Sequence, residues 1–591
     1  MKGKLLDLIG GHFNHKAIEV VRNNGTLRAT SDIWDMKIFV ATRKLHGNKD
    51  LHLMATNLIE NRVDSNHLPN DKPIHQDIRR LNRNCFSMGT ADWKSYKSSS
   101  SILIARILVE NVPYFKSFKN VLPKHIQHTY SAEMELKSTI INMPILNVKE
   151  VEYSECVKAL RQYELWIAEI YQQAGKLEKI PDIDSEGIGG NLAAHHGQTN
   201  AHTVFTADDP MKDMKIPFSG DQLTRVRFAG AKDLLKGAHS PADRLEHCSP
   251  FKPVMWHTKA SLLQYSYGML YQADSVDQVG TLKYFREKLN RKNVTPTKVL
   301  DSYEGSEELF LSVGKGYLVT GLLKFFGMTT LDDLPTANLL LKDLRGKTNE
   351  EKRKSLLDAV SRFVELFILQ QNYVRGDFVK DYSHMLIFLS VLVLQMKNTA
   401  KEGDGDRNFI NQKLLLQVFR SMGSHSKYAI EMFVAIAQQE CLLTPHLAHK
   451  FRWGYFVNWR GGPGNNMEED LAQEITNRIG KEIVRGMGPN KSISAISRVC
   501  KAVNGIKEIT ENFQKVCGNN PSSVQHTKVS EATDQLEIIN DLIKLDPFTH
   551  HSGRMHDSFP DIKSAPMRYL NVLEHHKWLE GKKQEMYIPR I

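Results

Sequence analysis

The sequence has few cysteines, and none of them lie close together. Its six cysteines are widely scattered and form no CxxC motif: Cys85, Cys156, Cys248, Cys441, Cys500 and Cys517. Zinc ribbons need closely spaced cysteine pairs, and small disulfide-stabilised domains need a dense cysteine framework. The cysteine pattern therefore argues against both classes and fits a reducing compartment.

Segments that would direct the chain into or across a membrane are also lacking. The first residues, MKGKLLDL, do not have the uninterrupted apolar core and small-residue cleavage site of a signal peptide. The longest apolar run, Met385 to Met396, is too short to span a bilayer and predicts a buried helix. We therefore expect a nuclear or cytoplasmic protein that is not secreted and has no transmembrane segment or membrane partner.

Several common catalytic fingerprints are missing as well. The sequence contains no Walker phosphate loop, no glycine-rich dinucleotide motif and no GxSxG nucleophile elbow. Nucleotide-dependent and serine-hydrolase chemistry of these kinds is therefore not indicated.

The chain that remains is long, ordinary in hydrophobicity and basic. It has 591 residues, of which 41% are hydrophobic and 25% charged, with a formal net charge of +11. Domains usually contain about 100–200 residues, so two to four structural units are expected. The basic excess fits a polyanionic partner, and we expect DNA, although a solvated basic surface would give the same composition. The oligomeric state stays open.

The order of periodic segments predicts a mixed α/β core interrupted by helical insertions. Residues 25–62 are rich in β-branched and aromatic residues and predict up to three consecutive strands, whereas 213–271 predicts strand, helix, strand, helix, with the second strand ending at His257. Nearly every periodic segment of 272–457 is helical. The expected units are 1–24 (helical), 25–62 (first core strands), 63–212 (helices and loops), 213–271 (second half of the core), 272–457 (all-helical insertion), 458–490 (acidic helix) and 491–591 (helical and flexible tail).

Asp221 is the most informative residue in this order. It follows the apolar run Pro217-Phe218 and Gly220, and precedes a helix-like segment. This pattern is typical of a strand end that presents a carboxylate for metal chemistry.

Two-metal phosphodiester chemistry needs several carboxylates that converge on cations about 3.5–4 Å apart. One familiar solution uses an aspartate on the first strand of a mixed sheet, a second at the end of the fourth strand, and an acid on a later helix. The chain offers Asp32 or Asp35, then Asp221, then Glu474, in that order. The cation would be Mg²⁺ or Mn²⁺, since hard cations prefer oxygen ligands.

The helix expected over 467–481 carries the third acid. Asp470, Glu474, Asn477 and Lys481 are spaced i, i+4, i+7 and i+11 and share one helical face. An ordinary surface helix with charge pairs at this spacing is the alternative.

Two further residues lie near Asp221 in the predicted core. His257 is placed to steer a phosphate or polarise water, or else to make a buried hydrogen bond with the sheet. Arg225, with Arg227, lies about one turn after Asp221 and is placed to meet a phosphate backbone or to balance the acids.

Three short motifs carry a family resemblance: Gly220-Asp221-Gln222, Trp256-His257 and Gln473-Glu474-x-x-Asn477. With them the chain resembles a large domain-of-unknown-function family of fungi and animals that is often carried by transposon-like genes. The order of its parts is similar to ribonuclease H-like transposases of the DDE type. The resemblance implies a ribonuclease H-like core with a large all-helical insertion, and metal ligation and catalysis by Asp32, Asp221 and Glu474. Asn477 would support them.

Three functions follow as alternatives. The first is a transposase-derived protein that cleaves DNA or transfers DNA strands with a divalent metal. The second is a domesticated nucleic-acid-binding or scaffold protein that has kept the fold and lost the chemistry. The third is a cellular nuclease that acts on RNA or on an RNA–DNA hybrid.

Overall fold

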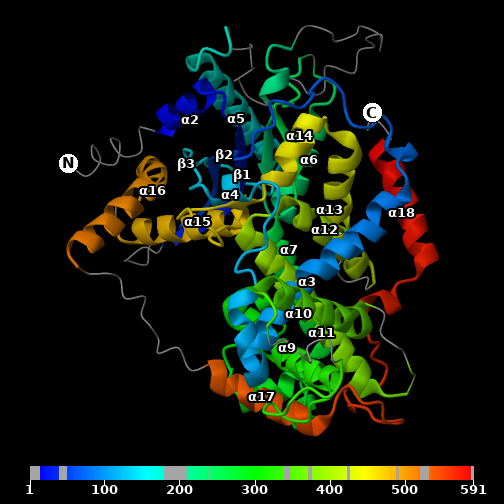
Figure 1. Ribbon diagram of the computed structural model, residues 1–591. Coiled ribbons are helices and arrows are strands. Elements are labelled where there is room, and N and C mark those ends of the chain that lie inside the picture. Colours follow the sequence, from blue (N-terminus) through cyan, green and yellow to red (C-terminus); the bar gives the residue numbers. More distant parts are fainter. Residues whose placement is uncertain are drawn as a thin grey trace.

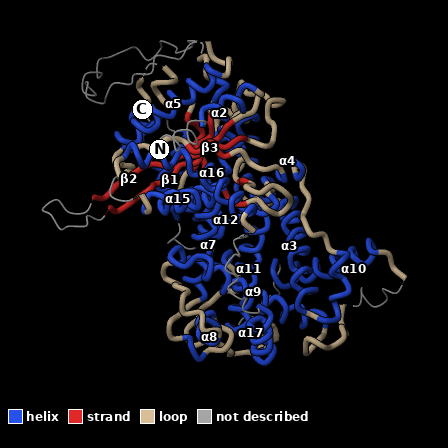
Figure 2. Tube along the Cα trace, turned by 90° about the vertical axis from the view of Figure 1, so that its left-hand side faces the viewer, coloured by secondary structure: helices blue, strands red, loops and turns tan. Residues whose placement is uncertain are grey.

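A small mixed β-sheet occupies one part of the molecule, and helices make up the rest of the computed structural model (Figures 1 and 2). The chain is therefore helix-rich with a small mixed sheet, as the sequence predicts. The structure describes residues 13–38, 49–178, 209–238, 240–338, 346–369, 374, 376–421, 426–487, 491–518 and 531–587.

The sheet has five strands in the order β3-β2-β1-β4-β5. The long strands β1 (Leu27–Ile38) and β2 (Lys49–Glu60) are antiparallel, and β3 (Ile140–Asn142) is antiparallel to β2. Strand β4 (Ile216–Ser219) is parallel to β1, and β5 (Cys248–Lys252) is parallel to β4. The first strand is therefore the centre of the sheet.

The two faces of β1 are covered by different helices. Successive side chains of a strand point to opposite faces. Leu27 and Ala29 point into a core shared with α5 (Tyr153–Gln173). Trp34 points to the other face, where its indole N–H donates to the backbone oxygen of Asn477 on α15 (Glu469–Arg485). Asp32 lies on this second face, beneath α15.

The second half of the sheet is built in the predicted order. Strand β4 is followed by α6 (Gln222–Leu234), and β5 by α7 (Met255–Leu270). A strand, a helix and a parallel strand in sequence form the unit expected of an α/β core. The pattern read over 213–271 is therefore confirmed, except that the second strand ends five residues earlier than expected.

The prediction of three consecutive strands within 25–62 is wrong. The described residues of that segment form only two strands, and the third strand of this edge, β3, comes from 63–212. Strand β3 is three residues long and precedes Pro144, so it is too short to show a period in the sequence. Pairing with β2, which is far away in sequence, defines it.

The large region after the sheet is helical, as predicted, with no strand among the described residues between α7 and β6 (Phe456–Val457). Two of its helices are long and apolar enough to span a membrane, but 83% of each apolar window is buried inside the protein, as in core helices. One of them contains the run from Met385 to Met396. The helices here are α8 (Leu282–Lys288), α9 (Tyr303–Phe326), α10 (Asn349–Phe363), α11 (Phe378–Glu402), α12 (Gly405–Ser421), α13 (Ser426–Ala437) and α14 (Pro445–Trp453).

The remaining elements surround these two parts. They are α2 (Phe13–Arg22), α3 (Thr90–Asn111), α4 (Ser131–Glu135), β7 (Met467–Glu468), α16 (Ile493–Val516), α17 (Glu531–Leu545) and α18 (Val572–Tyr587). Residues 1–12 of the expected N-terminal helical segment lie outside the described residues. Figure 1 shows α15 running from the middle of the molecule toward α16.

Candidate acidic site

Asp32 lies near the middle of β1, on the face that α15 covers. Its carboxylate accepts a 2.6 Å hydrogen bond from the side-chain amide of Asn477. The residue is only partly exposed, because the strand is central and the helix packs across it. The sheet and α15 therefore fix Asp32 from two sides.

Asp221 lies immediately after β4 and caps α6. One carboxylate oxygen accepts a 2.7 Å hydrogen bond from the backbone N–H of Thr224, a typical N-cap contact. The parallel register pairs Thr30 with Ser219, so its continuation by two residues brings Asp221 opposite Asp32. Gly220 permits this approach: a Cβ there would lie 2.6 Å from the Thr224 side chain and 3.1 Å from the Ser31 carbonyl.

Glu474 projects from α15 on the same face as Asp470 and Asn477, as the spacing predicts. Asn477 and Glu474 contact different elements. Asn477 reaches Asp32 on β1, while a Glu474 oxygen lies 3.7 Å from the Nε2 atom of His257 on α7. The surface-helix alternative is therefore wrong for this face of α15.

The pKa values show how closely the three acids are placed. Burial and the negative charges of Glu474 and Asp221, against the opposing charge of His257, together raise the pKa of Asp32 to about 7. Burial also raises the pKa of Glu474, with Asp221 and Asp470 adding to the effect. Carboxylates raise one another's pKa only when they share a small volume. Asp32, Asp221 and Glu474 thus form a cluster, which we call the acid cluster.

His257 lies in the first turn of α7, so the prediction that it ends a strand is wrong. Pro253 follows β5 directly, and the helix begins at Met255. Asp470 accepts hydrogen bonds from the backbone N–H of Trp256 (3.2 Å), the backbone N–H of His257 (3.0 Å) and the His257 ring at Nδ1 (3.1 Å). The Asp470 carboxylate on α15 therefore holds the start of α7, a role that the sequence pattern does not reveal.

This contact determines the charge of the imidazole. Burial alone would lower the pKa of His257, but the hydrogen bond and charge of Asp470, with the charges of Asp221 and Asp32, outweigh it and raise the pKa to about 9. His257 is therefore protonated at neutral pH. Its second nitrogen faces Glu474, so one positive charge lies beside the acid cluster.

Asn477 is held by a further amide. The Gln473 side-chain nitrogen donates a 2.9 Å hydrogen bond to the Asn477 side-chain oxygen, which leaves the Asn477 nitrogen to donate to Asp32. Both amides are almost fully buried. A fixed amide orientation at Asn477 directs its N–H group, and not its oxygen, at Asp32.

Buried ion pairs anchor the beginning of α15. Glu469 contacts Arg28 at 3.0 Å and Lys252 at 2.7 Å, and all three side chains are at most 2% exposed. Glu468 contacts Lys259 at 2.8 Å. The partners come from β1, β5 and α7, so α15 has one orientation relative to the sheet. The sequence shows the acids but not these partners.

Two predicted supporting residues are paired with side chains outside the acid cluster. Asp35 points to the opposite face of β1, is exposed, and forms a 2.7 Å pair with His52 across the strand. Arg225 forms a buried ion pair with Glu431 on α13, and Arg227 is paired in the same way with Glu150. Of the two candidates for the first acid, Asp32 is therefore the one beside Asp221, and Arg225 is engaged in balancing another acid.

The donor set of the acid cluster suits a hard cation, because it consists of carboxylate oxygens. Among the described residues, however, no group of three His, Cys, Asp or Glu side chains stands at the spacing of a formed metal site. The carboxylates of Asp32, Asp221 and Glu474 instead face N–H groups of Asn477, Thr224 and His257. A cation would replace these N–H groups at one oxygen of each acid.

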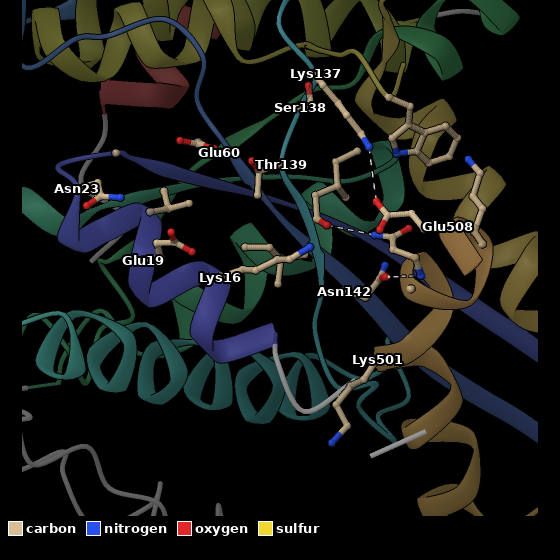
Figure 3. A pocket seen from close by; sticks show the side chains of 18 of the residues that line it. Lys16, Glu19, Asn23, Glu60, Lys137, Ser138, Thr139, Asn142, Lys501 and Glu508 are labelled. Atoms are coloured by element: carbon tan, nitrogen blue, oxygen red, sulfur yellow. Dashed lines mark hydrogen bonds and ion pairs between the residues drawn. The ribbon is translucent and has the colours of Figure 1, made fainter. Parts of the chain in front are cut away.

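Two cavities lie elsewhere on the molecule. One, of about 550 Å³, lies between α2, the β3 edge and α16 (Figure 3). The other, of about 850 Å³, lies between α6, α13 and α18. None of the three acids lines either cavity, so the acid cluster is separate from both.

Comparison with known proteins yields one match. The model of a family of unknown function (DUF6589) matches residues 73–526. This range includes Asp221, His257 and Glu474, and it begins after Asp32. No curated protein and no solved structure matches the chain.

Proposed function

We propose a function for this chain, which belongs to DUF6589, a family of unknown function. The function is metal-dependent cleavage or strand transfer of DNA by a transposase-derived protein, and it is inferred from the acid cluster. The convergence of Asp32, Asp221 and Glu474 carries the proposal. Burial and mutual repulsion of these acids raise the pKa of Asp32 to about 7, and a divalent cation would relieve that repulsion.

The placement of the acids supports a ribonuclease H-like core. The first acid is on the central strand β1, the second follows the parallel strand β4, and the third is on α15, after the all-helical region. This is the arrangement expected from the resemblance to DDE transposases. The sheet order, with two antiparallel strands on one side of β1 and two parallel strands on the other, agrees with it.

The chain's own residues have distinct roles in this proposal. Asp32, Asp221 and Glu474 would hold Mg²⁺ or Mn²⁺, which when bound activates the attacking oxygen and stabilises the leaving oxygen of a phosphodiester. Asn477 orients Asp32. His257, protonated at neutral pH and beside Glu474, is placed to donate a hydrogen bond to a phosphate oxygen.

A second function has one observation in its favour. The three carboxylates already face N–H groups of the protein, and the described residues contain no formed three-residue metal site. A domesticated protein that binds nucleic acid or acts as a scaffold without chemistry would keep such an arrangement. The cellular nuclease on RNA or RNA–DNA hybrids uses the same acids and differs in substrate.

The test is cleavage of labelled nucleic acid with Mg²⁺ or Mn²⁺ by wild type, Asp221→Asn, Glu474→Gln and Asp35→Asn. Asp35→Asn is a matched control, since Asp35 is an exposed acid on the same strand as Asp32. We expect wild type and Asp35→Asn to cut DNA, and the other two variants to lose at least 100-fold in rate.

Each other outcome is informative. Equal activity in all four proteins would contradict catalysis by the acid cluster. Activity in none of them would favour the inactive scaffold. Preferential cleavage of RNA or of an RNA–DNA hybrid would favour the cellular nuclease.

A further inference from the structure

The exposed face of α15 continues beyond Glu474 as a row of cations. Arg478, Lys481 and Arg485 follow Glu474 at i+4, i+7 and i+11, so they lie on the same side of the helix. Arg478 and Arg485 are exposed, and Lys481 is partly exposed. We call these three residues the α15 basic row.

The α15 basic row differs from the other cations near the acid cluster in its contacts. Arg28, Lys252 and Arg225 are each bound to a buried carboxylate. In the part of the chain that the structure describes, by contrast, no side-chain hydrogen bond or ion pair involves Arg478, Lys481 or Arg485. Lys481 acts on Glu474 through its charge alone.

On α15 itself the row has few competing acids. Glu482 is the single acid on the exposed face of α15 beyond Glu474, and it forms no ion pair with another described residue. Three cations against one carboxylate leave a net positive stripe that begins at the acid cluster. Such a stripe fits a polyanion that passes through the cluster.

The dimensions of the row fit a phosphodiester backbone. Eleven residues of helix span about 16 Å, and one strand of B-DNA carries a phosphate per about 3.4 Å of its axis. Three long side chains spaced along this length can contact neighbouring phosphates of a strand that runs beside the helix.

The row is also held rigidly in place. Buried ion pairs anchor the first turn of α15, and near its middle Gly480 brings the helix against Trp34, where a Cβ would lie 3.5 Å from the indole. A fixed orientation relative to the acids lets the row set the direction of a bound strand. A mobile surface segment with the same charge would not do so.

We propose that one strand of DNA leaves the acid cluster along α15 and that Arg478, Lys481 and Arg485 contact its phosphates. The inference rests on the proposed function, because it takes the acid cluster as the point through which the DNA passes. It adds to the proposed function the side of the acid cluster on which the DNA lies and the residues that bind the DNA there.

The test is DNA binding by fluorescence anisotropy between 50 and 200 mM salt. The variant Arg478→Gln/Lys481→Gln/Arg485→Gln is compared with a matched control, Lys94→Gln/Lys116→Gln/Lys119→Gln, which removes three exposed lysines from α3 and the segment after it. Each lost phosphate contact lowers the slope of log affinity against log salt by about 0.9. We expect the slope to fall by about 2.7 for the row variant and not for the control.

The outcomes separate this inference from the proposed function. Three outcomes would overturn the proposal that DNA lies along α15. They are an equal effect in the two triple variants, an unchanged slope in the row variant, and no DNA binding by the wild type. In the first two cases the proposed function would still hold if Asp221→Asn loses cleavage but keeps the wild-type slope of log affinity against log salt. An equal loss of binding to vesicles of anionic lipid would make the row a general polyanion surface and overturn its assignment to DNA.

Discussion

Replacing Asp32 by Asn should stabilise the metal-free protein while abolishing its proposed activity. The folded state raises the pKa of this carboxyl from 3.8 to about 7, so ionised Asp32 opposes folding. At 1.36 kcal/mol per pH unit the difference has a ceiling of about 4 kcal/mol. Asp32 is partly exposed, and solvent screening reduces the expected gain to about 2 kcal/mol.

The sign of the pH dependence follows from the same shift. The folded chain binds the proton more tightly than the unfolded chain, so wild-type stability falls as pH rises from 3.8 and levels off above about 7. The Asn side chain of Asp32→Asn does not titrate, so the stability of this variant does not show this decrease with rising pH. At pH 8 its melting temperature should be higher by about 2 °C for a chain of this length. At pH 5 the gap should be less than half as large.

Thermal melts of the variant are measured at pH 5 and pH 8, with and without Mg²⁺. Mg²⁺ at 100 times its dissociation constant should stabilise wild type by about 2.7 kcal/mol and Asp32→Asn far less. The control, Asp35→Asn, changes an exposed pair and should stay within about 0.5 kcal/mol of wild type. An Asp32→Asn variant that is no more stable than wild type at pH 8, or whose stability gap is the same at both pH values, would contradict a raised pKa of Asp32 in the folded protein.

Two further predictions concern the ion pairs around the acid cluster. Asp470→Asn should destabilise the protein by about 3 kcal/mol, because it leaves His257 without its buried partner, and NMR should show the pKa of His257 falling from about 9 to below 6.5. An unchanged pKa would contradict the assigned role of Asp470. Arg225→Gln should also cost about 3 kcal/mol by leaving Glu431, 2% exposed, unpaired. Burial already raises the pKa of Glu431, so the loss of stability in Arg225→Gln should be larger at pH 8 than at pH 5. In thermal melts the double variant Arg225→Gln/Glu431→Gln should recover most of the lost stability.

Much of the second half of the sheet could be predicted from the sequence because its signals are local. A short apolar run, a glycine and an aspartate define the end of β4 and the cap of α6. The i, i+4, i+7 spacing defines one face of α15. These features depend on neighbours within about two turns, which a single sequence shows.

The parts that could not be predicted depend on distant partners. The choice between Asp32 and Asp35 depends on which face of β1 is covered by α15, more than 430 residues later in the chain. The pairing of Arg225 with Glu431 joins residues 206 positions apart. Strand β3 is likewise defined by its pairing with β2. No local pattern in the sequence encodes these contacts.

The anchoring of α15 has a consequence for when the acid cluster forms. Arg28 is made among the first residues of the chain, whereas its partner Glu469 follows 441 positions later. Chain synthesis at roughly 5–20 residues per second separates Asp221 from Glu474 by about 10–50 s. During that interval the two aspartates are present without the third acid. Nascent chains that end before Glu474 therefore cannot assemble the cluster, and its formation is confined to molecules whose helical region has been made and whose α15 has docked on the sheet.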